Sequence, residues 1–241
     1  MIENVTARGR RSYQEDAGFI SYFGEGVLFG VFDGHGGWEC SKLCSTEFSI
    51  LFKQELENLG PKNPSLLLKN TFAKIVELTA NIVPGCTASV VFIPAERKKV
   101  HVAVLGDSPV VIGTSQGISV SPEHNARTNQ IDREAAEAKG AMYFQGYLGM
   151  PTQNGGLQLT RALGDREYSF LNREPEIYSL TAKDFVLVAS DGAFDPGHEN
   201  THLEIKRVVR KIRKGASALD IVERALAVPT YDNVTVLLWR P

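Results

Sequence analysis

Three hydrophobic, strand-like runs of this chain end or begin at an aspartate that has a flexible or amide-bearing neighbour. They are 27–32 before Asp33-Gly34-His35, 185–190 before Asp191-Gly192, and 234–239 after Asp232-Asn233. Carboxylates at strand ends can converge on one hard metal ion, because such ions prefer oxygen ligands. A fold that uses this pattern must bring distant strand ends together.

Asp33-Gly34 is the most informative of these pairs. An aspartate can bridge two divalent ions, and the following glycine lets its own carbonyl turn towards one of them. Asp191 follows a strand that is apolar on both faces, where a carboxylate is costly unless it is solvated, paired or metal-bound. Taken alone, each Asp-Gly is also compatible with a plain turn, and Asp232-Asn233 with a helix-to-strand turn.

A cluster near the N-terminus, Arg11-Ser12-Tyr13-Gln14-Glu15-Asp16, adds a cation and two carboxylates. A loop or strand here could place the Arg11 guanidinium on a phosphoryl group while Glu15 reaches a metal. A solvated loop is the commoner explanation of such a charge cluster when it stands alone. Together with His35, which suits proton transfer, the whole set points to metal-assisted phosphoester hydrolysis.

Length and charge limit the classes of protein to consider. The chain of 241 residues can bury one substantial core and has no linker-like stretch, so we predict one domain over residues 1–241. Its net charge of -2 gives no general attraction to nucleic acid or to a membrane. No leader and no long apolar run stands in the sequence, so we expect an intracellular protein of the cytoplasm and also of the nucleus.

Hydrophobic periodicity predicts strands and helices. The predicted strands are 18–22, 27–32, 88–93, 100–105, 110–112, 185–190 and 234–239. Apolar positions spaced by three and four predict amphipathic helices from Trp38 to Leu56 and from Leu68 to Ile82, and 131–138 predicts another that ends near Gly140. Thr201-x-x-Glu204 and Ser217-x-x-Asp220 resemble capping boxes that open two later helices.

The order of these elements favours an α+β fold over a parallel βαβ repeat. The runs 100–105, 110–112 and 118–120 follow one another through tight turns at 106–109 and 115–117, as an antiparallel meander would. We expect the first two helices to cover one face of a sheet.

Several reactive or charged side chains have a simpler interpretation. Cys40, Cys44 and Cys86 cannot all pair, and we expect buried free thiols that offer no alternative nucleophile. We expect the basic cluster Arg207, Arg210, Lys211, Arg213 and Lys214 to be a solvated helix face. The remaining histidines match no metal-ligand spacing, and surface or packing roles are expected for His101, His124, His198 and His202.

Eight motifs give the chain a resemblance over almost its whole length to metal-dependent protein serine/threonine phosphatases of type 2C, the PPM family. They are Arg11-x-x-x-Glu15-Asp16, Val31-Phe32-Asp33-Gly34-His35-Gly36-Gly37, Gly85-Cys86-Thr87-Ala88, Gly106-Asp107-Ser108, Leu159-Thr160-Arg161-Ala162-Leu163-Gly164-Asp165, Glu174-Pro175-Glu176-Ile177, Ala189-Ser190-Asp191-Gly192 and Asp232-Asn233-Val234-Thr235. Eight motifs in this order are far more specific than one Asp-Gly pair.

The resemblance implies a fold, an activity and a site. The fold would be a central β-sandwich of two antiparallel sheets flanked by helices in four αββα layers, with two Mg²⁺ or Mn²⁺ ions at one end. By analogy Asp33 would bridge the ions, Glu15 and the Gly34 carbonyl would serve one, and Asp191 and Asp232 the other. Arg11 would hold the phosphate oxygens of a phosphoprotein substrate. His35 would protonate the leaving serine or threonine alkoxide after direct attack by a metal-bridging water.

Three departures from the family pattern bear on activity. Pro109 stands where the Gly-Asp-Ser run usually continues with arginine. Glu123 stands where many members have an aspartate that helps to bind a weaker third metal, and its longer side chain argues against a third site here. The stretch 166–173 is short compared with members that carry a long flap near the active site.

Three functions remain to be compared. The favoured one is a phosphatase, expected to be a monomer. The second is a weakly active or catalytically silent family member that acts as a regulatory binding scaffold. The third is a metallo-nuclease, which would also use clustered carboxylates. The chain has no basic stripe with interleaved aromatic residues, and this argues against a nuclease.

Overall fold

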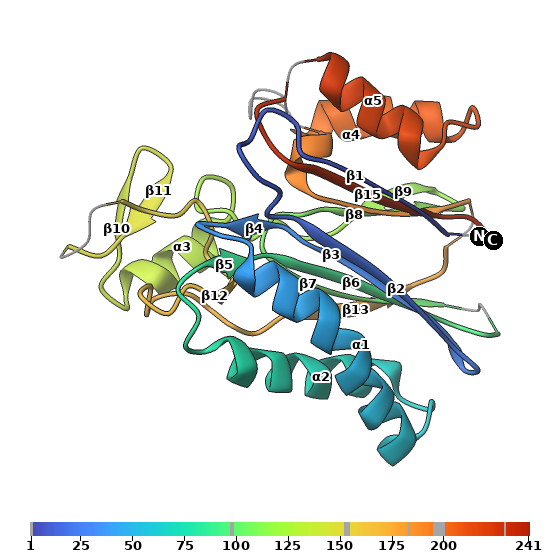
Figure 1. Ribbon diagram of the computed structural model, residues 1–241, viewed down its shortest axis with the longest axis horizontal. Helices are drawn as coiled ribbons and strands as arrows, with labels where there is room; N and C mark the ends of the chain where they lie inside the picture. Colours follow the sequence, from blue (N-terminus) through green and yellow to red (C-terminus); the bar gives the residue numbers. More distant parts are fainter. Residues whose placement is uncertain (1, 97–98, 152–154, 183, 195–200, 229) are drawn as a thin grey trace.

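Two antiparallel sheets lie face to face at the centre of the molecule, with helices on both outer sides (Figure 1). The computed structural model describes residues 2–96, 99–151, 155–182, 184–194, 201–228 and 230–241. In spatial order, one sheet has β13 (Glu176–Leu180), β7 (Val100–Leu105), β6 (Ala88–Pro94), β3 (Gly26–Phe32) and β2 (Ala17–Phe23). The other sheet has β1 (Ile2–Ala7), β15 (Val234–Trp239), β14 (Val186–Ala189), β8 (Val110–Thr114) and β9 (Gly117–Val120).

Four helices cover the outer faces in two pairs. On the sheet of β2, β3, β6 and β7 lie α1 (Glu39–Leu59) and α2 (Pro64–Thr79), and on the other sheet lie α4 (Thr201–Ile212) and α5 (Ala218–Ala227). The Phe48 ring of α1 packs on Phe32 of β3 and on Phe72 of α2, with ring centroids 5.9 and 5.0 Å apart. The predicted α+β sandwich with αββα layers is therefore confirmed.

Alternating side chains explain why both sheets need this cover. In β6, Val90 and Phe92 pack towards α1 and α2, whereas Val91 and Ile93 pack between the two sheets. The residues of β15 divide in the same way between the α4–α5 side and the sheet interface. Because successive strand residues point to opposite faces, strands that are apolar at every position must be buried on both faces.

The two predicted capping boxes have different outcomes. Ser217 and Asp220 form the box expected at the start of α5, with each side chain bonded to the other residue's backbone N–H. A helix also opens at Thr201, but Thr201 is the first helical residue rather than the cap. The Glu204 carboxylate there bonds Arg224 of α5, so it joins α4 to α5 instead of closing a box.

One predicted connection is wrong. We expected β7, β8 and β9 to form one meander, but β7 and β8 belong to different sheets and only β8 and β9 form a hairpin. The turn 106–109 crosses from one sheet to the other, and hydrogen bonds to both sheets hold it in this position. The Ser108 hydroxyl lies 2.7 Å from Thr87 Oγ1 beside the first sheet, and the Pro109 carbonyl accepts from the Ala189 N–H of the second.

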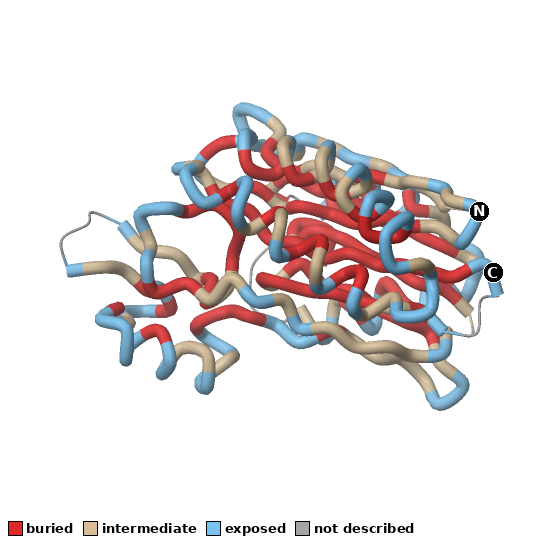
Figure 2. The backbone as a smooth tube through the Cα atoms, turned by 90° about the horizontal axis from the view of Figure 1, so that it is seen from below, coloured by how far each residue is buried: buried red, intermediate tan, exposed pale blue. Residues whose placement is uncertain are grey.

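Smaller elements are added at one end of the sandwich. A three-stranded sheet contains β12 (Leu163–Gly164), β5 (Gly85–Cys86) and β4 (Gly34–His35), and a hairpin contains β10 (Met142–Phe144) and β11 (Tyr147–Gly149). The hairpin and α3 (Gln130–Glu137) project beyond the sheets at the left of Figure 1. Figure 2 shows that the continuous buried backbone lies in the stacked sheets, whereas the projecting part alternates between buried and exposed residues.

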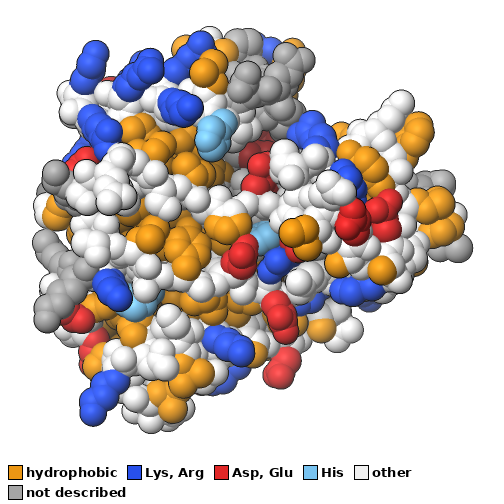
Figure 3. All heavy atoms as spheres, turned by 180° about the vertical axis from the view of Figure 1, so that it is seen from behind, with side chains coloured by type: hydrophobic (Ala, Val, Ile, Leu, Met, Phe, Trp, Pro, Cys, Tyr) orange, Lys and Arg blue, Asp and Glu red, His pale blue; other side chains and the backbone are white. Residues whose placement is uncertain are grey.

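The predicted exposure of the basic cluster is confirmed, although α4 ends at Ile212 and Arg213 and Lys214 lie in the turn after it. All five Lys and Arg side chains of the cluster at 207–214 are exposed. Figure 3 shows blue side chains gathered at the upper left, over α4 and α5. In the part of the chain that the structure describes, no helix has both the length and the apolar composition that crossing a bilayer requires.

Candidate active site

A cavity of about 280 Å³ opens at the end of the sandwich that faces the β10–β11 hairpin. Most of the sequence-predicted site residues line it, together with residues of the small sheet and of the segment after the hairpin. The lining includes Arg11, Asp33, Gly34, His35, Thr87, Asp107, Tyr147, Asp191 and Asp232.

Both sheets deliver carboxylates to this cavity. Asp33 follows β3, and its backbone is held to Thr87 by bonds of 2.9 and 3.2 Å. In the other sheet, Asp191 follows β14 and Asp232 precedes β15, and these two strands are neighbours. The two turns pack tightly, because a Cβ on Gly192 would lie 2.1 Å from the Asn233 carbonyl oxygen. The expected convergence of distant strand ends is therefore what the fold produces.

Two of the buried carboxyl groups have a raised pKa. Burial raises the pKa of Asp33 well above its usual value, and the charges of Asp16, Asp191 and Asp232 raise it further. Burial likewise raises the pKa of Asp16 to about 6. These oxygens stay spread around the cavity, since no three carboxylates among the described residues bring their ligand atoms within 4.8 Å of one another. One buried oxygen, Asp16 Oδ1, has no hydrogen-bond partner there.

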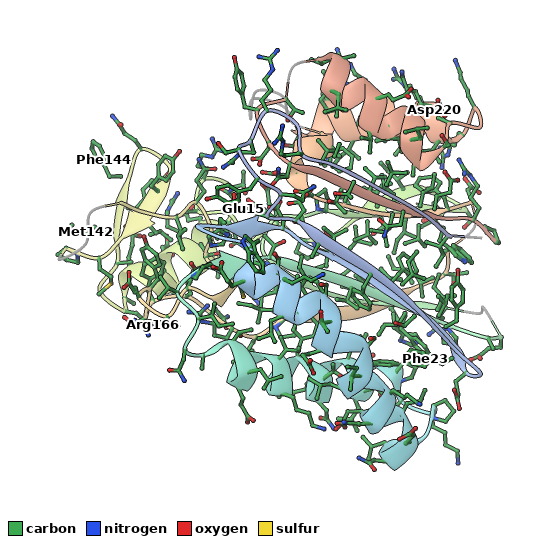
Figure 4. The ribbon with its side chains drawn as sticks, in the orientation of Figure 1. Glu15, Phe23, Met142, Phe144, Arg166 and Asp220 are labelled. Carbon is green, nitrogen blue, oxygen red and sulfur yellow. The ribbon has the colours of Figure 1, made fainter. Side chains whose placement is uncertain are left out.

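Glu15 lies beneath the cavity and is not among its lining residues. Its Oε1 accepts from the Gly37 N–H at 2.7 Å, and its backbone N–H donates to Asn233 Oδ1 at 2.8 Å. Figure 4 shows Glu15 at the end of the sandwich, between the two sheets, with Met142 and Phe144 on the projecting hairpin. Glu15 is only 5% exposed, so the hydrogen bond from the Gly37 N–H, rather than solvent, satisfies its carboxylate.

Arg11 places a cation at the mouth of the cavity. Its guanidinium donates to Asp232 Oδ2 at 2.9 Å and lies 3.8 Å from Glu15 Oε2, while its side chain is 48% exposed. The loop that carries Arg11 and Glu15 is held by the side chain of Asn233, a role that the Asp232-Asn233 motif did not indicate. The Asn233 amide donates to the carbonyls of Arg8 and Tyr13 in addition to accepting from Glu15.

His35 pairs with an aspartate for which the sequence analysis gave no role. Its Nε2 lies 2.7 Å from Asp165 Oδ2. Burial lowers the pKa of His35, but the hydrogen bond and the charge of Asp165 outweigh burial, so the pKa is raised overall. Gly85 lies against this pair, since a Cβ there would be 2.1 Å from Asp165 Oδ2. The only sequence signal was the place of Asp165 at the end of the 159–165 motif.

Two other acidic residues were missed in the same way. Asp16 accepts from Ser190 Oγ at 2.7 Å, and Asp107 accepts from Asn125 Nδ2 at 2.9 Å. Both occur in motifs that carried the resemblance, but their neighbours in the sequence do not distinguish them from surface carboxylates.

Glu123, His101, His124 and His202 are not among the residues that line the cavity. Glu123 lines a separate space of about 560 Å³, which it shares with Asp107 and Pro109, so Asp107 borders both spaces. His124 is fully buried and bonds Glu176, and His202 is exposed, as expected of packing and surface roles. His198 lies outside the described residues.

Comparison with known proteins decides the family. Residues 8–234 match the family model described as protein phosphatase 2C. The chain belongs to the protein phosphatase 2C family. Members of this family are metal-dependent protein serine/threonine phosphatases, in agreement with the resemblance read from the sequence motifs.

Relatives of this phosphatase 2C chain cover nearly all of it. Protein phosphatase 2C homolog 1 of Saccharomyces cerevisiae is 26% identical, over 99% of this chain and 91% of the yeast protein. The structure of the serine/threonine phosphatase Stp1 of Staphylococcus aureus is 26% identical with a TM-score of 0.70, over 100% of this chain and 94% of that one. A Caenorhabditis elegans sex-determining protein shares the fold with a TM-score of 0.83 at 23% identity, over 99% of this chain and 64% of that one.

Proposed function

We propose that this protein removes phosphate from phosphoserine and phosphothreonine in phosphoproteins, by direct attack of water and with two Mg²⁺ or Mn²⁺ ions as cofactors. The observation that carries the proposal is the meeting of Asp33, Asp191, Asp232, Arg11 and His35 around one cavity. Carboxylates, a guanidinium and an imidazole are the groups that metal binding, phosphate binding and proton transfer respectively require.

The donor set fits hard divalent ions. Asp33 would bridge the pair, with Glu15 and the Gly34 carbonyl on one ion and Asp191 and Asp232 on the other. Burial and, after it, the charges of neighbouring carboxylates raise the pKa of Asp33, and a divalent cation would relieve that repulsion. When bound, the two ions supply charge that lowers the pKa of the attacking water and stabilises the entering and leaving oxygens.

Arg11 is proposed to bind the phosphoryl group. Its guanidinium lies at the cavity mouth, is half exposed and now bonds the Asp232 carboxylate. A phosphate dianion offers the same planar fork a pair of oxygens, so a bound substrate can take the place of the carboxylate.

His35 is proposed to donate a proton to the departing alkoxide. A serine alkoxide is a strong base, so it leaves faster when an acid protonates it. The Asp165 carboxylate accepts a hydrogen bond from the protonated ring at Nε2, which keeps the ring oriented and favours its protonated form. Asp165 is therefore a positioning residue for His35.

The test is turnover of a phosphoserine peptide and of para-nitrophenyl phosphate with and without Mg²⁺ or Mn²⁺. We expect hydrolysis of both, its loss in excess chelator, and no inhibition by thiol alkylation, since all three cysteines are buried. Turnover that persists in chelator would contradict the metal mechanism. No turnover of either substrate with either ion would favour the alternative of a silent scaffold.

Three narrower statements stay predictions from the sequence. They are one domain over residues 1–241, a monomeric state, and a place of action in the cytoplasm and the nucleus. A third metal site at Glu123 is a separate question, which the altered affinity of a Glu123→Asp variant for Mn²⁺ would answer.

A further inference from the structure

All three cysteines of the chain meet at one point in the fold. Cys40 and Cys44 lie on consecutive turns at the start of α1, and Cys86 lies on β5, more than 40 residues away in the sequence. The Cys86 sulfur lies 3.4 Å from that of Cys40 and 3.9 Å from that of Cys44. Within the described residues, this is the one group of three His, Cys, Asp or Glu side chains whose ligand atoms all lie within 4.8 Å of one another.

We propose that Cys40, Cys44 and Cys86 form a binding site for a thiophilic metal ion, Zn²⁺ or Cu⁺, separate from the carboxylate centre. Thiolates select such soft ions over Mg²⁺ or Mn²⁺. Sulfurs bound to one Zn²⁺ at about 2.3 Å are roughly 3.8 Å apart in a tetrahedral arrangement. The spacings of 3.4 and 3.9 Å found here bracket that value.

The surroundings of the sulfurs suit a bound cation. All three cysteines are 0% exposed, so no water shares the site from the surface. The Cys86 thiol lies within hydrogen-bonding distance of the other two sulfurs, and hydrogen bonding with Cys44 and Cys86 lowers the pKa of the Cys40 thiol to about 5. A buried thiolate is costly without a compensating positive charge, and the N-terminal turn of α1 supplies only a partial one. A metal ion would supply the rest.

Glycine keeps the space beside the cluster open. A Cβ on Gly164 would lie 2.8 Å from the Cys40 sulfur, and Gly164 also has a φ of +69° that other residues rarely adopt. Three sulfurs without a fourth His, Cys, Asp or Glu ligand among the described residues match the three-coordinate geometry common for Cu⁺. Zn²⁺ ordinarily takes a fourth ligand.

The site would join the helix layer to the backbone that holds the proposed proton donor. Cys86 pairs with Gly34 of β4 on one side and with Leu163 of β12 on the other. These strands lead to His35 and to Asp165, and α1 lies directly beside them (Figure 1). A bound ion would therefore fix the start of α1 against the strands beneath the His35–Asp165 pair.

The experiment titrates reduced, Mg²⁺-saturated protein with Zn²⁺ in one arm and, without oxygen, with Cu⁺ in the other. The readouts are the thiolate-to-metal charge-transfer absorption, native mass spectrometry and the melting temperature. The absorption requires sulfur ligands, so ions bound at the carboxylates do not contribute to it. We expect one equivalent of Zn²⁺ or Cu⁺, a charge-transfer band and a raised melting temperature.

Variants separate ligation from packing. Cys40→Ala and Cys86→Ala should lose the band and bind the ion more than about 100-fold more weakly, beyond the loss typical of a supporting contact. Ser45→Ala is the matched control on α1: its hydroxyl bonds the Lys42 carbonyl, so the variant should bind as the wild type does. If either cysteine variant does not fold, the wild-type stoichiometry and absorption still decide the question.

Two results would overturn the proposal. One is that wild-type protein binds neither ion with a charge-transfer band. The other is an equal band in the wild type and in folded Cys40→Ala and Cys86→Ala variants. In both cases the three cysteines would be packed thiols, as the sequence predicted.

Discussion

His35 Nε2 lies 2.7 Å from Asp165 Oδ2, and the side chains of the two residues are 28% and 3% exposed. The carboxylate is thus almost fully buried behind a ring that can still meet a substrate at the cavity. Asp165 also has a φ of +49°, and its carbonyl accepts from Arg173 at 3.0 Å, so its backbone is held in place. This arrangement resembles other histidine–carboxylate pairs in which the acid orients the ring.

Asp165→Asn should slow hydrolysis of a phosphoserine peptide by about 10- to 100-fold, the range for loss of a group that orients a functional residue. Asp165 raises the pKa of His35, so its removal lowers that pKa. A general acid works while protonated, and the fall of kcat on the alkaline side should therefore move to lower pH. The measurement is kcat against pH for both enzymes. An unchanged alkaline limb would contradict the role of Asp165.

Arg11→Ala and His35→Gln should differ in their dependence on the leaving group. Arg11 would bind oxygens common to all phosphomonoesters, so its loss should weaken phosphopeptide and para-nitrophenyl phosphate alike, chiefly by raising KM. His35→Gln should harm the phosphopeptide more, because para-nitrophenolate leaves without a proton. Equal losses in kcat on both substrates, with chemistry rate-limiting, would make His35 a residue that only orients its neighbours.

Asp191→Asn and Asp232→Asn should each reduce turnover by about two orders of magnitude or more, since a correctly held metal contributes several kcal/mol. The fold should persist because the change also relieves repulsion among the carboxylates. Calorimetry should show weaker Mn²⁺ binding in both. Asp184→Asn is a suitable control, because Asp184 is a partly exposed carboxylate paired with Arg213. Unchanged Mn²⁺ affinity in both site variants would exclude these ligands.

The metal-free protein should lose stability through Asp16 as the pH rises. Burial raises the pKa of Asp16 from 3.8 to about 6 in the folded state. A carboxyl group with a raised folded pKa stabilises the fold fully below pH 3.8, and this contribution is lost as the pH rises through about 6. We therefore compare the melting temperatures of the wild type and of Asp16→Asn in the presence of chelator. The difference, wild type minus variant, should decrease as the pH is raised from 4 to 7. A difference that grows with pH would contradict the shift.

Part of the site could be predicted because its signals are local. Asp33, Asp191 and Asp232 each lie next to an apolar strand, where an unpaired carboxylate is costly, so their function is visible within a few residues of sequence. The place of Glu15 was harder to predict. The sequence suggested a metal ligand, but it could not show that the Gly37 N–H and Asn233 would hold this residue beneath the cavity.

The edge strands show the same limit for the fold. β1 contains Glu3, Asn4 and Thr6 among its apolar residues and was not predicted, although it pairs with β15 along its whole length. An edge strand has one neighbour and one exposed side, so its composition is closer to that of a loop. The turn 106–109 looked like a hairpin for a related reason. Its four residues fit a tight turn equally well within one sheet or between two.

The sequence by itself determined the strands of the sandwich other than the edge strands β1 and β13, and the carboxylates that follow or precede those strands, because hydrophobic period and strand-end carboxylates are properties of neighbouring residues. Only the tertiary structure decided which distant groups meet. Asp165 reaches His35 from 130 residues away, and Cys86 reaches Cys40 from 46 residues away. Such contacts depend on strand register and on the packing of whole layers, and no local pattern in the chain specifies either.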